Sequence, residues 1–367
     1  MVGVSSLVSL STILEDMVVS TSLLGVISVG LGLVTLPKDH EVHFSFKIGL
    51  DGAGSNEGHE PLVGAGGEVP QIKVFDNQRR LIGKSKTHYM CKDGTDHCVR
   101  IIKDVHEQPS YALLIGQRNP ICIAAATVRY PGGDMYGWTG NWAKTCKQQW
   151  YYSDIDAQVQ NGTTKLLCAW VGKSGYKDDF ATAIQIHWPE FGEGFTGNGK
   201  DDQYYCKKDN TALSFFRHSG PWGFNGITKN DHKVKEKGEK EREKHIKKMK
   251  KLAEEALKKK KKKDKHKVKT PGRDTRSIRS HFDGHSAKHL CESDTSVGPS
   301  LVSLPERTFC HMPDKVLYKF CEDVPLGVCW NRTAHAFAFT GNLSIHARAA
   351  MPDIQFPQPL VWGKGGE

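Results

Sequence analysis

The alternation of apolar and polar residues predicts β-strands over most of the chain before residue 230. Between residues 42 and 48, apolar side chains alternate with polar ones, which is typical of a strand with one buried face. The apolar runs 166–171 and 184–188 have a similar character and are separated by turn residues. Further on, the runs 334–339 and 343–347 flank Thr340-Gly341-Asn342, which predicts a hairpin with glycine in its turn.

One segment between these regions has a different character. Residues 233–269 contain 19 Lys and Arg against seven Asp and Glu, a local charge of +12. Since the whole chain carries +10, the remainder carries −2, and the protein outside this segment is not basic. Apolar residues at 246, 249, 253 and 256 follow helical 3/4 spacing. We therefore predict one charged helical linker with a thin apolar stripe.

Three interpretations of this linker remain open. It is a solvated connection, a patch that binds a glycosaminoglycan or an anionic membrane surface, or a segment that binds nucleic acid. We expect no nucleic-acid partner, because no Phe, Tyr or Trp lies between residues 233 and 269 to stack on bases. The predicted polyanion-binding residues are Lys258, Lys259, Lys260, Lys261, Lys262 and Lys263.

The N-terminal region contains the most apolar part of the chain. No charged residue occurs between Met17 and Pro37, a length that suits a signal peptide or a membrane span. The flanks fit neither pattern well, because residues 1–16 contain no Lys or Arg. We predict a removed signal peptide, with an uncleaved signal-anchor as the alternative.

These patterns predict a mainly β, disulfide-stapled, loop-rich protein in four parts. A leader covers residues 1–37, and a β-rich domain covers 38–230. The basic linker covers 231–279, and a smaller cysteine-bearing β domain covers 280–367.

The cysteines are even in number and contain no C-x-x-C pair, so zinc ribbons and thioredoxin-like sites have no template here. We predict up to five disulfides formed in an oxidising compartment, against the alternative of reduced core thiols in a cytosolic protein. Cys91 with Cys98, and the group Cys310, Cys321 and Cys329, suggest local loops, although spacing leaves the connectivity open. The ten are Cys91, Cys98, Cys122, Cys146, Cys168, Cys206, Cys291, Cys310, Cys321 and Cys329.

Three N-x-[ST] sequons support the same compartment. They begin at Asn161, Asn331 and Asn342, outside the basic segment and among aromatic and apolar runs. Together with the leader and the cysteines, they predict an exported glycoprotein that is secreted or displayed at an extracellular surface.

Aromatic residues are dense between residues 136 and 152. Most of them suit the core of a loop-rich β domain, because large rings bury well. The alternative is a binding surface in which rigid rings anchor a partner. The predicted receptor-binding residues are Tyr136, Trp138, Trp142, Trp150 and Tyr151.

Catalytic motifs do not account for the function. The sequence has no G-x-S-x-G, H-E-x-x-H or P-loop pattern, and we predict no enzyme and no cofactor. His281, His285 and His289, spaced by four residues, would share a helix face and form a zinc site with Asp283 or Cys291. We favour exposed histidines and a disulfide-bonded cysteine over that site, and a hydrolase with distant carboxylates is a further alternative.

Arg273, Arg276 and Arg279 form two overlapping R-x-x-R patterns after a Pro-Gly turn. A protease with acidic subsites reads such spacing on an exposed loop. Cleavage after Arg276 or Arg279 is therefore a candidate processing event, against the alternative of an uncut linker.

The organisation of the chain resembles the surface subunit of a retroviral envelope glycoprotein, of the gammaretrovirus-like kind that includes endogenous copies. The residues that carry the likeness are the linker stretch 241–248 and Cys329-Trp330, which stands where that family has Cys-Trp-x-Cys. The second cysteine of that motif is absent, since Asn331-Arg332 follows. The resemblance implies a receptor-binding part without fusion machinery.

We therefore expect a secreted or cell-surface glycoprotein that binds a protein receptor on cells. The alternative is a secreted glycosaminoglycan-binding protein that acts through the Lys-rich segment.

Overall fold

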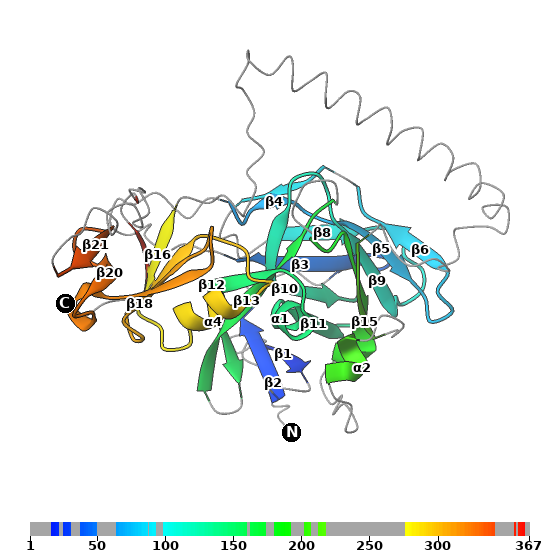
Figure 1. Cartoon of the computed structure of the whole chain (residues 1–367). Coiled ribbons are helices and arrows are strands. Elements are labelled where there is room, and N and C mark those ends of the chain that lie inside the picture. Colours follow the sequence, from blue (N-terminus) through cyan, green and yellow to red (C-terminus); the bar gives the residue numbers. More distant parts are fainter. Residues whose placement is uncertain are drawn as a thin grey trace, which may run out of the picture.

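A computed structural model of the chain describes residues 16–21, 25–30, 37–49, 64–86, 88–92, 98–159, 162–173, 180–191, 202–206, 212–217, 276–341, 356 and 359–363. The described part of the protein is mainly β (Figure 1), as the sequence predicts.

The largest sheet has eight strands in the order β1-β2-β12-β13-β10-β3-β8, and β11 also pairs with β10. The predicted strand at residues 42–48 is β3, which pairs antiparallel with β10 and β8. The strands are β1 Asp16–Thr21, β2 Gly25–Gly30, β3 Val42–Ile48, β8 Cys98–Ile102, β10 Ile121–Arg129, β11 Met135–Thr139, β12 Trp150–Val159 and β13 Gly162–Val171.

A second, five-stranded antiparallel sheet packs on the first. Its order is β15-β14-β9-β5-β6. Phe44 and Phe46 of the large sheet share one hydrophobic cluster with Ile72 and Leu114 of the second sheet. Burial of these side chains is the main force that joins the two layers. The strands are β5 Gln71–Phe75, β6 Leu81–Lys84, β9 Tyr111–Ile115, β14 Ala183–His187 and β15 Leu213–Phe216, and the short pair β4 Gly67–Glu68 and β7 Met90–Cys91 lies apart from them.

A third sheet follows the basic segment. Its order is β19-β18-β17-β16-β22, and β16 pairs parallel with both β17 and β22. Ser286 caps the short helix α4 by accepting a hydrogen bond from the backbone N–H of His289. The elements are β16 Ser277–Ser280, α4 Ala287–Glu292, β17 Ser300–Ser303, β18 Thr308–His311, β19 Val316–Lys319, η4 Cys321–Asp323, β20 Gly327–Asn331, β21 Ala336–Thr340 and β22 Leu360–Trp362.

The third sheet shares a core with the rest of the molecule. The Trp170 indole N–H donates to the Val297 carbonyl at 2.8 Å, and the Tyr151 hydroxyl donates to the Pro299 carbonyl at 2.7 Å. Gly298 lies so close to Tyr151 that a Cβ at this position would come within 2.4 Å of the ring. The boundary at residue 280 stays a prediction, and the described parts on its two sides are in intimate contact.

All ten cysteines pair, which confirms the disulfide framework. Cys91 with Cys98 and Cys321 with Cys329 are the local loops that the spacing suggests. Cys310, which the spacing groups with Cys321 and Cys329, is bonded instead to Cys291, and spacing suggests no partner for the cysteines of the other two bonds. The three remaining bonds are Cys122–Cys168, Cys146–Cys206 and Cys291–Cys310, where Cys146 follows α1 (Asn141–Thr145) and Cys206 ends α2 (Asp202–Cys206).

The predicted hairpin around residues 340–342 has its second strand at residues 343–347, which lie outside the described residues, so this hairpin stays a prediction. Its first strand overlaps β21, which pairs with the preceding strand β20 across a turn at residues 332–335. Residues 16–21 and 25–30, inside the predicted leader, are strands, and β2 pairs with β12. Removal of these residues from the mature chain stays a prediction.

Candidate functional site

The aromatic residues proposed as a receptor-binding surface lie mostly in the core. Trp138, Trp150 and Tyr151 have exposed fractions of 0%, and Trp142 has 2%. Only Tyr136 of the five is half-buried. A partner cannot contact the other four without opening the fold, so this surface is corrected to a core. The physical reason is that these rings fill the space around α1, η1 (Trp188–Phe191) and the third sheet.

Several other predicted site residues lie outside the described residues. These are the glycosylation sites Asn161 and Asn342 and the polyanion-binding lysines Lys258 to Lys263. Their roles stay predictions.

The proposed cleavage sites lie at the third sheet. Arg276 immediately precedes β16, and its carbonyl accepts a hydrogen bond from the backbone N–H of Ser300. Arg279 lies within β16, which has a parallel partner on each side. A protease needs an exposed, detachable segment. Cleavage after Arg279 would therefore require β16 to leave the sheet, and this placement argues against a processing loop there.

The histidines proposed as a zinc site do not converge. Among the residues that the structure describes, no group of three or more His, Cys, Asp or Glu side chains is placed to hold a metal ion. Cys291 is bonded to Cys310. His285 is instead enclosed by the rings of Tyr152, Phe282 and Trp362, with ring-centre distances of 4.6–5.2 Å.

The burial of His285 predicts acid sensitivity. Burial, aided by the charge of Lys165, lowers the pKa of His285 from 6.5 to about 4. The folded state therefore binds this proton less readily than the unfolded state. The contribution of the neutral His285 ring to the free energy of unfolding is fully present above pH 6.5 and is lost as the pH falls through 4. The loss is about 3 kcal/mol at most.

We expect the melting temperature to fall between pH 7 and pH 4.5 less steeply in His285→Gln than in the natural chain. The exposed His289 gives a matched control, because His289→Gln should keep the natural slope. Thermal unfolding at several pH values measures both. Equal slopes in all three proteins would show that His285 is not the source of the acid sensitivity.

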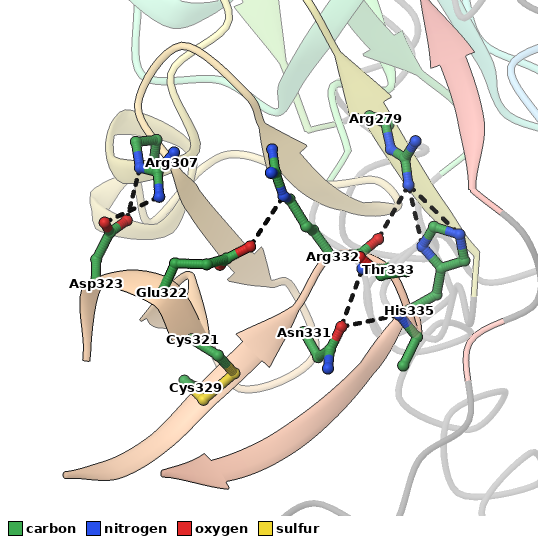
Figure 2. A network of polar contacts seen from close by, with 11 residues as sticks. Arg279, Arg307, Cys321, Glu322, Asp323, Cys329, Asn331, Arg332, Thr333 and His335 are labelled. Carbon is green, nitrogen blue, oxygen red and sulfur yellow. Dashed lines mark hydrogen bonds and ion pairs between the residues drawn. A yellow bond between two sulfur atoms is a disulfide. The ribbon is translucent and has the colours of Figure 1, made fainter. Parts of the chain in front are cut away.

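Residues 316–341, together with Arg307, present an exposed surface, which we call the C-terminal tip. Beneath it, the rings of Phe309 and Trp330 stack at 3.9 Å and form a separate cluster with Phe320 and Phe337. The Cys321–Cys329 disulfide ties η4 to β20. Polar contacts connect the side chains on the same surface (Figure 2).

Two ion pairs cover the tip. Arg307 makes two hydrogen bonds to the carboxylate of Asp323, at 2.7 and 2.9 Å, and Arg332 Nε donates to Glu322 at 3.0 Å. The hydrogen bonds from Arg307 hold the pKa of Asp323 below its usual value. These exposed pairs contribute little to stability but give the surface a fixed charge pattern.

Asn331 is the first residue of the one sequon whose asparagine is among the described residues. It lies at the end of β20, where the β20–β21 hairpin, which we call the tip hairpin, turns. Its side-chain oxygen accepts hydrogen bonds from the backbone N–H groups of Thr333 and Ala334, at 3.0 and 2.9 Å. Such an Asx turn engages the oxygen and leaves the amide nitrogen, the atom that carries an N-glycan, unused by these bonds. The geometry is compatible with the glycosylation that the sequence predicts.

Exposed apolar side chains lie at the other end of this hairpin and along β19. Leu326, with 67% of its side chain exposed, is the most exposed large apolar residue among those described. Val316 and Leu317 are 40% and 37% exposed on β19, an edge strand of the third sheet. Sequence reasoning missed this surface, because these residues lack a motif and their exposure depends on which strand ends the sheet.

The fold and these sites define a disulfide-bonded, mainly β protein with an exposed C-terminal tip. No family model matches the chain, and no curated protein matches it. Within the described ranges, no helix has both the length and the apolar character needed to cross a membrane.

Proposed function

We propose that this chain is an exported, disulfide-bonded glycoprotein that binds a protein receptor at a cell surface through its C-terminal tip. The pairing of all ten cysteines carries the export part of the proposal. Structural disulfides persist in oxidising compartments such as the secretory pathway and the extracellular space. The turn geometry at Asn331 supports a glycan on the exported chain.

The composition of the tip supports a protein partner. Protein interfaces obtain most of their binding energy from a few apolar or arginine side chains surrounded by polar groups. Leu326 supplies an exposed apolar anchor, and Arg307 and Arg332 supply oriented guanidinium groups. Asn331 lies five positions after Leu326 along an extended strand. At a rise of about 3.3 Å per residue, a glycan on Asn331 would attach about 16 Å from the Leu326 anchor.

The resemblance to a retroviral envelope surface subunit stays a prediction. On that hypothesis the chain would engage the receptor of related viruses and compete with them for it. The Lys-rich alternative, glycosaminoglycan binding through residues 258–263, also stays a prediction, since the segment lies outside the described residues.

Replacing Leu326 with glutamate should weaken cell-surface binding at least about tenfold, because a carboxylate would be desolvated where an apolar anchor is needed. Binding of the fluorescent, secreted protein to a panel of cell lines by flow cytometry measures this. Leu81→Glu is the matched control, because Leu81 is also an exposed leucine but lies on β6 of the second sheet.

Two results would contradict the proposal. One is the absence of saturable, protease-sensitive binding sites on any cell line of the panel. The other is an equal loss of binding in Leu326→Glu and Leu81→Glu, which would show that the tip is not the contact surface.

A further inference from the structure

One arginine of the third sheet lies beneath the turn of the tip hairpin. Ile278 and Ser280 are fully buried on one face of β16, so Arg279 projects from the opposite face by the alternation of a strand. Figure 2 shows the Arg279 guanidinium directed toward the Arg332 backbone and the His335 ring.

The charges around this arginine do not balance. Arg279 lies next to the tip, near Arg332 and the two ion pairs described above (Figure 2). Arg307 pairs with Asp323, and Arg332 pairs with Glu322. Arg279 has no carboxylate partner among the described residues. It donates through Nη2 to the Arg332 carbonyl and to the His335 ring, both at 3.2 Å.

Part of the guanidinium is also unused. Arg279 Nε is buried and has no hydrogen-bond partner. A buried donor without an acceptor destabilises a protein, and so does a partly buried cation beside a second cation. Burial and the charge of Arg332 accordingly lower the pKa of Arg279.

The neighbouring histidines do not offset this charge. Burial, followed by the charge of Arg279, lowers the pKa of both His281 and His335. At neutral pH both rings are therefore neutral, and each offers an N–H donor or a ring-nitrogen acceptor according to its tautomer. The site as described is a fixed, uncompensated positive charge with additional donors around it.

We propose that Arg279, together with His335, forms a binding site for a compact oxyanion of the sulfate or phosphate type. A guanidinium presents a planar fork of N–H donors that matches such groups and forms strong, charge-assisted bonds to them. The hairpin turn at residues 332–335 forms the second wall of the site. This inference does not depend on receptor binding, because a free anion tests it.

A purely structural role for Arg279 gives a different expectation. The bond from Nη2 to the Arg332 carbonyl also fixes the hairpin turn. If that were its whole role, its replacement would lower stability equally with and without the anion. The anion dependence of stability therefore separates the two roles.

The test uses the full secreted chain at pH 7, with sodium sulfate or sodium phosphate titrated against sodium chloride at constant ionic strength. Thermal unfolding and isothermal calorimetry report binding. We expect a saturable stabilisation of the natural chain that is reduced at least about tenfold in apparent affinity in Arg279→Met, since charge-assisted bonds to a guanidinium are lost. Arg307→Met, which removes an exposed and paired arginine, should retain the natural response.

Sulfate also stabilises proteins by exclusion from their surface, so the comparison between variants decides the outcome. An identical anion response in Arg279→Met and the natural chain would overturn the proposal, as would the absence of calorimetric binding to the natural chain. If Arg279→Met does not fold, Arg279→Lys keeps the charge without the fork and should still bind less tightly. Binding of a sulfated heparin disaccharide or of an inositol phosphate would support the site and identify which source supplies the anion.

Discussion

Replacing Trp150 with alanine is expected to lower the free energy of unfolding by about 3–5 kcal/mol, because it removes a large ring from a closed core. The side chain has no exposed surface and meets Tyr152 edge-on at 5.3 Å. Its indole N–H donates to the Ser293 hydroxyl at 3.2 Å, and its backbone pairs with the segment around Ser296. The loss should appear as a lower midpoint in urea or thermal unfolding.

Two further variants make this prediction specific. Trp150→Phe keeps most of the ring and should lose much less stability than Trp150→Ala. Tyr136→Ala removes a half-buried ring of the same aromatic segment and should also lose less. If Trp150→Ala were no less stable than Tyr136→Ala, the ring would not be a core residue. Cell binding that survives in Trp150→Phe would further separate the core role from receptor contact.

The aromatic segment explains why two regions far apart in sequence form one core. Trp150 and Tyr151 are the first residues of β12, and their polar atoms reach Ser293 and Pro299, which lie between α4 and β17. Each of the two rings therefore buries apolar surface against residues 293–299, and its N–H or O–H group finds a hydrogen-bond acceptor in the same segment. A core of this kind couples the third sheet to the first, so damage on either side is expected to destabilise both.

Local patterns were sufficient to predict some elements. The strand at residues 42–48 was predictable because its apolar and polar residues alternate. The expectation of a single buried face was wrong, because β3 lies between β10 and β8 and both of its faces are buried. Cys91–Cys98 and Cys321–Cys329 were suggested by spacing because short loops close readily. The mainly β class follows from the same local signals.

Long-range features were not predictable in this way. The parallel pairing of β16 with β17 and β22 joins residues near 278 to residues near 360, and no spacing rule specifies it. That pairing is also why Arg279, expected on an exposed linker, lies within a sheet. The tip surface depends on β19 being an edge strand. The position of the Arg279 guanidinium depends on how the hairpin turn at residues 332–335 folds over β16.

Replacing Cys122 and Cys168 together with alanine is expected to lower the free energy of unfolding by about 4 kcal/mol, the entropy gained by the unfolded chain when a long loop opens. The bond spans 46 residues and joins β10 to β13, and both cysteines are fully buried. The double replacement of Cys91 and Cys98 opens a loop of only seven residues and should lose about 2 kcal/mol. Urea unfolding of both variants, with secreted yield as a second measurement, gives the comparison. An equal or larger loss for the Cys91–Cys98 variant would contradict loop entropy as the dominant contribution and would place it instead in local packing around the short loop.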